Sequence, residues 1–211
     1  MVIKWDVTIP RLSGDTPRRA YIYLPESYDE EPDRRYPVMY MFDGHNVFFD
    51  EDATFGKSWG MNDYMERTGK QLIIVGVECN HQGNCRLSEY SPVTFENAEL
   101  GKIRGRGSTT MNWMVNELKP YIDEHFRTLP DRRNTILAGS SMGGLMALYG
   151  AAAYNSVFQR AACLADMCGG FGSLAQQGFL TLFPAREAHR AERETVQILG
   201  KGRRRRTFST R

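Results

Sequence analysis

The stretch NTILAGSSMGGLMALYGAAA, residues 134–153, decides how this chain folds. Residues 134–139 form an apolar run as short as a buried strand, and the apolar run from residue 142 onward is long enough for a helix. Between the two runs, Gly139-Ser140-Ser141-Met142-Gly143 matches the pattern G-x-S-x-G. This pattern predicts a sharp strand-to-helix turn with Ser141 at its apex and the Ser141 hydroxyl projecting above a sheet.

The predicted turn gives Ser141 the surroundings of a nucleophile. Small residues on both sides allow the strand and the helix to approach closely, and Gly144 extends this small surface. The start of the helix presents unpaired N–H groups that stabilise developing negative charge. We therefore expect Ser141 to be a nucleophile and the N–H of Met142 to be one oxyanion-hole donor. A turn with a purely structural role is the alternative interpretation.

The rest of the chain predicts an α/β sandwich. Two alternating runs, residues 3–9 and 19–25, flank a segment with Gly and Pro and predict an antiparallel N-terminal hairpin. Strand and helix patterns then alternate, which implies a mostly parallel sheet with helices on both faces. The further strands are expected at 37–43, 71–78, 134–139 and 160–166, and the helices at 58–69, from about 111 to 126 with a kink or break at Pro120, and directly after Ser141.

Charge is distributed unevenly along the 211 residues. Residues 185–211 hold 9 of the 27 basic and 3 of the 25 acidic residues, which leaves the preceding part with a net charge of −4 against an overall +2. We expect residues 1–166 to form the α/β domain and residues 167–211 to form a divergent helical or disordered basic tail. The run RRRR at 203–206 is interpreted as a solvated end and not as a nucleic-acid contact.

Several classes of protein are not supported by the composition. The N-terminus lacks the basic start and apolar run of a secretory signal, and the most apolar run, residues 72–77, is too short to span a bilayer, so a cytoplasmic protein without membrane contact is expected. The four cysteines, Cys79, Cys85, Cys163 and Cys168, have no zinc-ligand spacing. We therefore expect no metal and no cofactor.

Several segments in order resemble the putative esterase family of α/β-hydrolases, which includes enterochelin-type siderophore esterases and esterase D-like enzymes. The resemblance runs across residues 18–164. The matching segments are RAYIYLPESYD, YPVMYMFDGHNVFFD, SWGMNDYMER, RLSEYSPV, VNELKPYIDEHFRTLPDRRNTILAGSSMGGLMALYGAAAYNSVF and RAACL. The resemblance implies an α/β-hydrolase-like fold and a serine carboxylic-ester hydrolase acting on a small-molecule ester.

The resemblance also implies roles for single positions. Ser141 matches the nucleophile, and the turn Asp43-Gly44-His45 is similar to the family segment whose backbone supplies the second oxyanion donor, here the N–H of His45. Trp59 and the segment 86–90 match blocks that lie around the mouth of the site in relatives.

The chain departs from the family after Leu164. Members carry an acid and then a glycine-flanked histidine after the nucleophile, and neither block is present here. Asp166 and His189 follow Ser141 in the family order, whereas His45 and His81 lie in loops after strands, and which of the four completes a triad stays open. His125, on the helix before the turn, is interpreted as structural.

Two functions therefore remain at this stage. The chain is either an active ester hydrolase or a truncated or frameshifted esterase remnant that at most binds ligands. If the late strands are missing, the last strand exposes an unpaired edge, through which we expect self-association.

Overall fold

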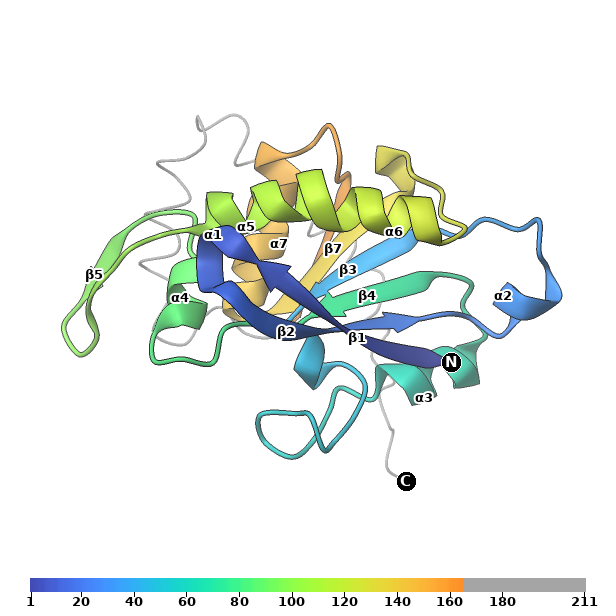
Figure 1. The fold of residues 1–211 in the computed structure, drawn as a ribbon, viewed down its shortest axis with the longest axis horizontal. Coiled ribbons are helices and arrows are strands. Elements are labelled where there is room, and N and C mark those ends of the chain that lie inside the picture. Colours follow the sequence, from blue (N-terminus) through green and yellow to red (C-terminus); the bar gives the residue numbers. More distant parts are fainter. Residues whose placement is uncertain (165–211) are drawn as a thin grey trace, which may run out of the picture.

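The computed structural model describes residues 1–164, and a six-stranded sheet of the order β1-β2-β4-β3-β7-β8 forms its centre (Figure 1). The strands are β1 (Val2–Ile9), β2 (Gly14–Tyr23), β3 (Val38–Phe42), β4 (Ile73–Val77), β7 (Thr135–Ser140) and β8 (Arg160–Leu164). The pairs β1–β2 and β2–β4 are antiparallel, whereas β4, β3, β7 and β8 run parallel to one another. This topology confirms the mostly parallel sheet with an antiparallel N-terminal hairpin.

The N-terminal hairpin is longer than the sequence predicts. A single helical turn, α1 (Pro10–Ser13), joins its strands, and β2 begins at Gly14 instead of residue 19. Gly14 pairs with Ile9 across a register shift that follows Val7. Its φ of 58° lies in the left-handed region, which glycine adopts without a steric penalty, so the chain can reverse direction there.

Two apolar clusters cover the two faces of the sheet. Alternate residues of β3 point to opposite faces, so Tyr40 and Phe42 join one cluster and Met41 joins the other. The first cluster includes Met111 and Met146, from α5 (Gly107–Trp113) and α7 (Met142–Ala153). The second includes Met65 of α3 (Met61–Thr68). Helices therefore lie on both sides of the sheet, as expected (Figure 1).

The helix that precedes the strand-to-helix turn at Ser141 is continuous through Pro120, but its hydrogen bonding changes just before this residue. Between α5 and α6 (Lys119–His125) the chain forms a π-helical turn, η2 (Met114–Leu118). Proline has no N–H to continue the α-helical ladder, and a π turn accommodates such a gap. The predicted break is thus a local widening of the helix.

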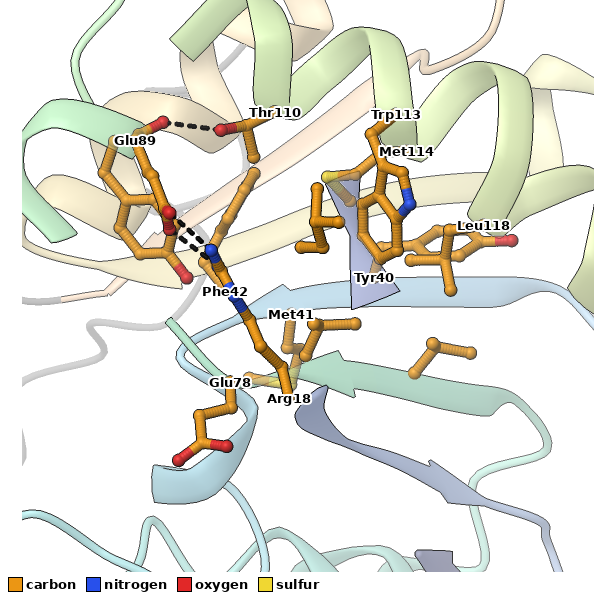
Figure 2. Close-up of a pocket in the computed structure, with 14 residues that line it drawn as sticks. Arg18, Tyr40, Met41, Phe42, Glu78, Glu89, Thr110, Trp113, Met114 and Leu118 are labelled. Atoms are coloured by element: carbon orange, nitrogen blue, oxygen red, sulfur yellow. Dashed lines mark hydrogen bonds and ion pairs between the residues drawn. The ribbon is translucent and has the colours of Figure 1, made fainter. Parts of the chain in front are cut away.

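The segment from about 79 to 107, for which the sequence patterns above indicate neither a helix nor a strand, contains regular structure. It forms α4 (Cys85–Glu89) and a two-stranded ribbon of β5 (Phe95–Asn97) and β6 (Gly101–Ile103). Glu89 is buried and makes a double ion pair with Arg18 of β2, with 2.7 Å between Nη1 and Oε2 (Figure 2). The Oγ1 atom of Thr110 donates to the Glu89 carbonyl oxygen (2.8 Å). These contacts, which sequence periodicity does not report, hold α4 in place.

Short helical turns complete the described part: α2 (Ser27–Glu30), η1 (Gly44–Asn46) and η3 (Arg132–Asn134). No helix within residues 1–164 combines the length and the apolar character needed to cross a membrane. The predicted tail at 167–211 and the candidates Asp166 and His189 lie outside the described residues.

Candidate active site

Three neighbouring parallel strands, β4, β3 and β7, end at the same edge of the sheet, where ligands of open α/β sheets bind. The residues after β3 include Asp43 and His45, those after β4 include Cys79 and His81, and Ser141 follows β7. All five line one open pocket of about 440 Å³. The fold therefore gathers polar side chains from the loops after β3 and β4 around Ser141.

The backbone at Ser141 has the geometry of a nucleophile elbow. Its φ is 53° and its ψ −121°, between the end of β7 and the first residue of α7. Its side chain is exposed, whereas Met142 is buried. A Cβ atom on Gly139 would lie 2.4 Å from the carbonyl carbon of Gly143, so the turn requires the small residues that the motif supplies.

A second strained turn lies beside the elbow. Asp43 has left-handed φ and ψ of 57° and 51°, and its N–H donates to the hydroxyl of Tyr90 (3.0 Å). Its carboxylate accepts two hydrogen bonds of 2.8 Å from Arg86, one from Nε and one from Nη2. The next residue, Gly44, leaves no room for a side chain, since a Cβ there would lie 2.5 Å from Gly76. An ion pair with two hydrogen bonds, in which Asp43 is buried and Arg86 is partly exposed, thus fixes the direction of the chain after β3.

The imidazole of His45 lies inside the turn. It is 3% exposed, and its Nε2 lies 3.0 Å from Oγ1 of Thr54, while its Nδ1 is buried without a hydrogen-bond partner among the described residues. Burial lowers the pKa of His45 below its ordinary value, against the opposing charge of Asp43. The ring is therefore held neutral, with one nitrogen unsatisfied.

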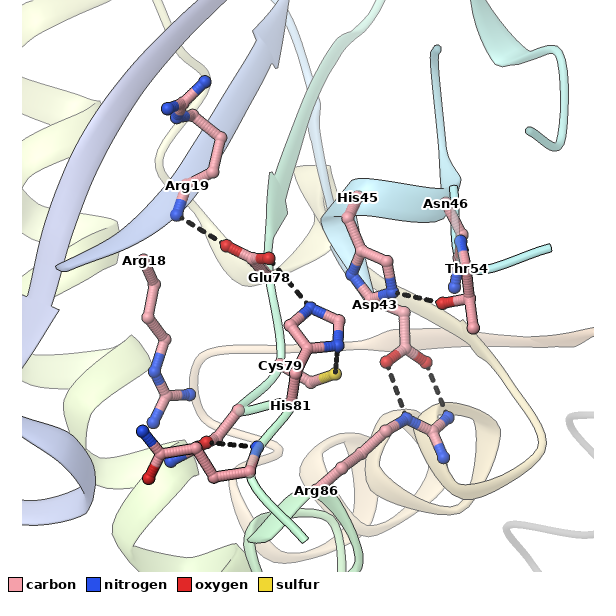
Figure 3. Close-up of polar contacts among 12 residues, drawn as sticks. Arg18, Arg19, Asp43, His45, Asn46, Thr54, Glu78, Cys79, His81 and Arg86 are labelled. Carbon is pink, nitrogen blue, oxygen red and sulfur yellow. Dashed lines mark hydrogen bonds and ion pairs between the residues drawn. The ribbon is translucent and has the colours of Figure 1, made fainter. Parts of the chain in front are cut away.

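The loop after β4 brings a thiol and a second imidazole against that ring (Figure 3). The rings of His45 and His81 meet edge to face, with centroids 4.6 Å apart. Nδ1 of His81 lies 4.0 Å from Sγ of Cys79, and its Nε2 lies 2.8 Å from Oε1 of Glu78. Burial raises the pKa of the Cys79 thiol far above its ordinary value. The Cys79 thiol therefore stays protonated at neutral pH.

The structure places most of the predicted site residues together. Ser141, His45 and His81 share the pocket with Trp59 and Arg86, two residues of the segments expected at its mouth. Glu89 and Tyr90 of the same segment are instead buried beneath it and act as supports. His125 stacks on Tyr121, at a centroid separation of 4.1 Å, and its Nδ1 lies 2.8 Å from the Tyr121 carbonyl oxygen.

Sequence reasoning missed the contacts around Ser141. These are the Asp43–Arg86 pair, the Glu78–His81 pair and the meeting of Cys79 with both histidines. A signal was present, because the polar residues directly after adjacent parallel strands converge at one edge of a sheet.

The model of the family described as "Putative esterase" matches residues 13–208. The chain belongs to this family. The match continues beyond residue 164, where the segments quoted above end, so the family resemblance is more extensive than those segments indicate.

Two curated proteins are similar to this chain in sequence. An uncharacterized protein of Bacillus subtilis, YbbA, is 24% identical over 143 residues, which make up 67% of this chain and 53% of the relative. An esterase of Mycobacterium tuberculosis is 31% identical over 140 residues, which make up 66% of this chain and 27% of the relative. The chain thus aligns with about half of the first relative and a quarter of the second.

Solved structures share the fold. An IroE-like serine hydrolase from Shewanella oneidensis superposes with a TM-score of 0.57 at 20% identity, over 86% of this chain and 56% of that one. The BES protein from Bacillus cereus gives 0.57 at 22% identity, over 94% and 69%. The enterochelin esterase of Shigella flexneri gives 0.55 at 18% identity, over 77% and 35%.

Proposed function

We propose that this member of the esterase family hydrolyses carboxylic esters with Ser141 as the nucleophile. The observation that carries the proposal is the Ser141 backbone, which has φ 53° and ψ −121° at a strand-to-helix junction and directs an exposed side chain into the pocket. Non-glycine residues adopt such a conformation when the surrounding structure imposes it, and strain of this kind concentrates at active sites.

The oxyanion hole follows from the two turns beside the nucleophile. Met142 is the first residue of α7, and the first N–H groups of a helix have no intrahelical partner. In the turn after β3, the N–H of Asn46 donates the first hydrogen bond of the turn, to the carbonyl oxygen of Asp43 (2.9 Å). The N–H of His45 lies one residue before this donor and is not used in that bond. We assign these two N–H groups, of Met142 and His45, to the developing oxyanion.

In the proposed reaction Ser141 Oγ attacks the ester carbonyl and its proton passes to a general base. The alcohol leaves with a proton, and water then releases the acyl group from Ser141. His81 has the carboxylate partner that such bases use, because its Nε2 contacts Glu78. His189 is the other candidate, because it follows Ser141 in the chain, as the catalytic histidine follows the nucleophile in members of the family.

The decisive experiment is a burst assay with p-nitrophenyl acetate. The wild type should release p-nitrophenol with a burst, and Ser141→Ala should lose roughly 10³-fold or more in kcat, since the remaining N–H donors act on a substrate without a nucleophile. Equal rates in the two proteins would overturn the proposal and favour a remnant that at most binds ligands.

A second comparison identifies the base. His81→Ala and His189→Ala are assayed beside His125→Ala, a control outside the pocket whose ring stacks on Tyr121. A loss of kcat confined to His81→Ala identifies His81, paired with Glu78, as the general base. A loss confined to His189→Ala identifies His189 as the general base.

A further inference from the structure

Three metal-ligand side chains meet at the wall of the pocket. One ring nitrogen each of His45 and His81 and the Sγ atom of Cys79 all lie within 4.8 Å of one another. His45 and Cys79 are buried, and His81 closes the cluster from the solvent side with half of its side chain exposed. We call these three residues the His2Cys cluster.

The unpartnered nitrogen of His45 points to a ligand. His45 is 3% exposed, and its Nδ1 is buried without a hydrogen-bond partner among the described residues, while its Nε2 is already engaged by Thr54. A buried polar atom left unsatisfied costs about 1–3 kcal/mol, and such atoms in native proteins call for an explanation. A cation at Nδ1 would supply the missing partner.

Both imidazoles have the outer contacts of metal-bound histidines. A ligating histidine typically directs its second ring nitrogen to an oxygen atom that fixes the orientation of the ring. His81 makes this contact with Oε1 of Glu78, and Oε2 of Glu78 accepts from the backbone N–H of Arg19 (3.0 Å), which ties it to β2. His45 makes the equivalent contact with the Thr54 hydroxyl.

We propose that the His2Cys cluster binds a divalent cation of the zinc class. Two imidazoles and one thiolate suit Zn²⁺, and three protein ligands leave a fourth tetrahedral position for water. Zinc bonds of the usual length separate tetrahedral ligand atoms by about 3.4–3.6 Å. The three ligand atoms lie within 4.8 Å of one another, with 4.0 Å between those of Cys79 and His81, so binding draws them together by up to about 1.4 Å, and the half-exposed His81 can supply part of this movement.

Binding is a simple exchange of a proton for the cation. The S–H bond of Cys79 breaks as the S–metal bond forms, and the thiol proton passes to the buffer. Both imidazoles bind in their neutral form. The proposal does not depend on Ser141 chemistry, although the bound cation would occupy the two described histidines of the same pocket.

The test uses the reduced full chain, freed of metal with a chelator and titrated with Co²⁺ as a spectroscopic probe. We expect one equivalent to give visible tetrahedral d–d bands and a near-ultraviolet thiolate-to-cobalt band, and Zn²⁺ to bleach both. Zn²⁺ affinity is then measured by competition with a chromogenic chelator. Cys79→Ser should abolish the thiolate band, and His81→Ala should weaken Zn²⁺ binding at least about 10-fold.

Cys85→Ser is the matched control, because Cys85 is the first residue of α4, directly after the loop that holds Cys79 and His81, and is not part of the cluster. It should leave the spectrum and the affinity unchanged. His81→Ala, at an exposed position, keeps the test valid if the buried Cys79→Ser change impairs folding, which circular dichroism reports. Absence of the bands in the wild type, or bands that survive both Cys79→Ser and His81→Ala, would overturn the proposal.

Discussion

Two residues next to each other in space carry the backbone strain of this site. Within residues 1–164, Asp43 and Ser141 are the non-glycine residues with positive φ, at 57° and 53°. A Cβ atom added to Gly143, two residues after Ser141, would lie 3.3 Å from Oδ2 of Asp43, so the two turns pack directly together. Each such conformation costs about 1–3 kcal/mol. The protein maintains both conformations at residues that line the same pocket.

The positive φ of Ser141 predicts different stabilities for two variants that both lack its hydroxyl. Ser141→Gly should raise the free energy of unfolding by about 1 kcal/mol relative to Ser141→Ala, because glycine adopts positive φ freely and alanine does not. Both variants lack the hydroxyl, so the comparison isolates the backbone. Urea unfolding measures the difference, and equal midpoints would show that Ser141 is not strained.

At the scale of elements, two ion pairs, one fully and one partly buried, hold the segments around the pocket. The Arg18–Glu89 pair, with side chains 5% and 3% exposed, joins β2 to α4. The Asp43–Arg86 pair joins the turn after β3 to the same helix. A helix of five residues has little stability of its own, so these contacts determine its position.

Removing one partner of the buried pair should be costly. Glu89→Gln leaves Arg18 buried without its counter-charge and should lower the free energy of unfolding by about 3–5 kcal/mol. Glu31→Gln is the control, because it breaks an exposed pair with Arg34 and should cost no more than about 1 kcal/mol. Denaturant unfolding of both variants checks this, and similar small losses would contradict the structural role of Glu89.

The loop that leads to Trp59 has an acid-sensitive support. The carboxylate of Asp50 accepts from Nζ of Lys57 (2.9 Å) and from the N–H and hydroxyl of Ser58 (2.9 and 2.8 Å). These hydrogen bonds, that from Lys57 foremost, lower its pKa from 3.8 to about 2. Because the folded pKa lies below the unfolded value, the carboxylate stabilises the fold above about pH 4, and this contribution is lost as pH falls through about 2.

Asp50→Asn therefore predicts a change in pH dependence. The variant should be less stable than the wild type above pH 4, and the two should converge as pH approaches 2. Urea unfolding at several pH values between 2 and 6 measures the gap. A gap of constant size across that range would contradict a titrating Asp50.

At the scale of the whole molecule, the sheet edge at β8 bears on association between chains. Within the described residues, β8 pairs with β7 on one side, and no strand pairs with its other side. An unpaired strand edge is a template for association between chains. We propose that the protein self-associates through this edge.

Light scattering after size-exclusion chromatography tests this proposal. The average mass should rise with protein concentration, because pairing between edges is bimolecular. A single monomeric mass across a wide concentration range, with a cooperative melt at high temperature, would count against it.

Much of the architecture could be predicted from local patterns. The apolar runs around Tyr40, Val75 and Leu137 gave the central strands, because a strand buried on both faces must be continuously apolar. Boundaries within residues 79–107 could not be predicted in this way. The structure of that segment depends on two ion pairs, Arg18 with Glu89 and Arg86 with Asp43. The partners of each pair are remote in sequence and belong to different parts of the fold.

The sequence by itself determined the elbow, because G-x-S-x-G between an apolar strand and an apolar helix is a local pattern with a local geometric reason: only small residues allow Gly139 and Gly143 to touch. The surroundings of Ser141 were decided by the tertiary structure alone. Whether His45, Cys79 and His81 face one another depends on β3 and β4 pairing in parallel, so that their ends meet. Strand pairing is a contact between distant segments, and spacing along the chain does not encode it.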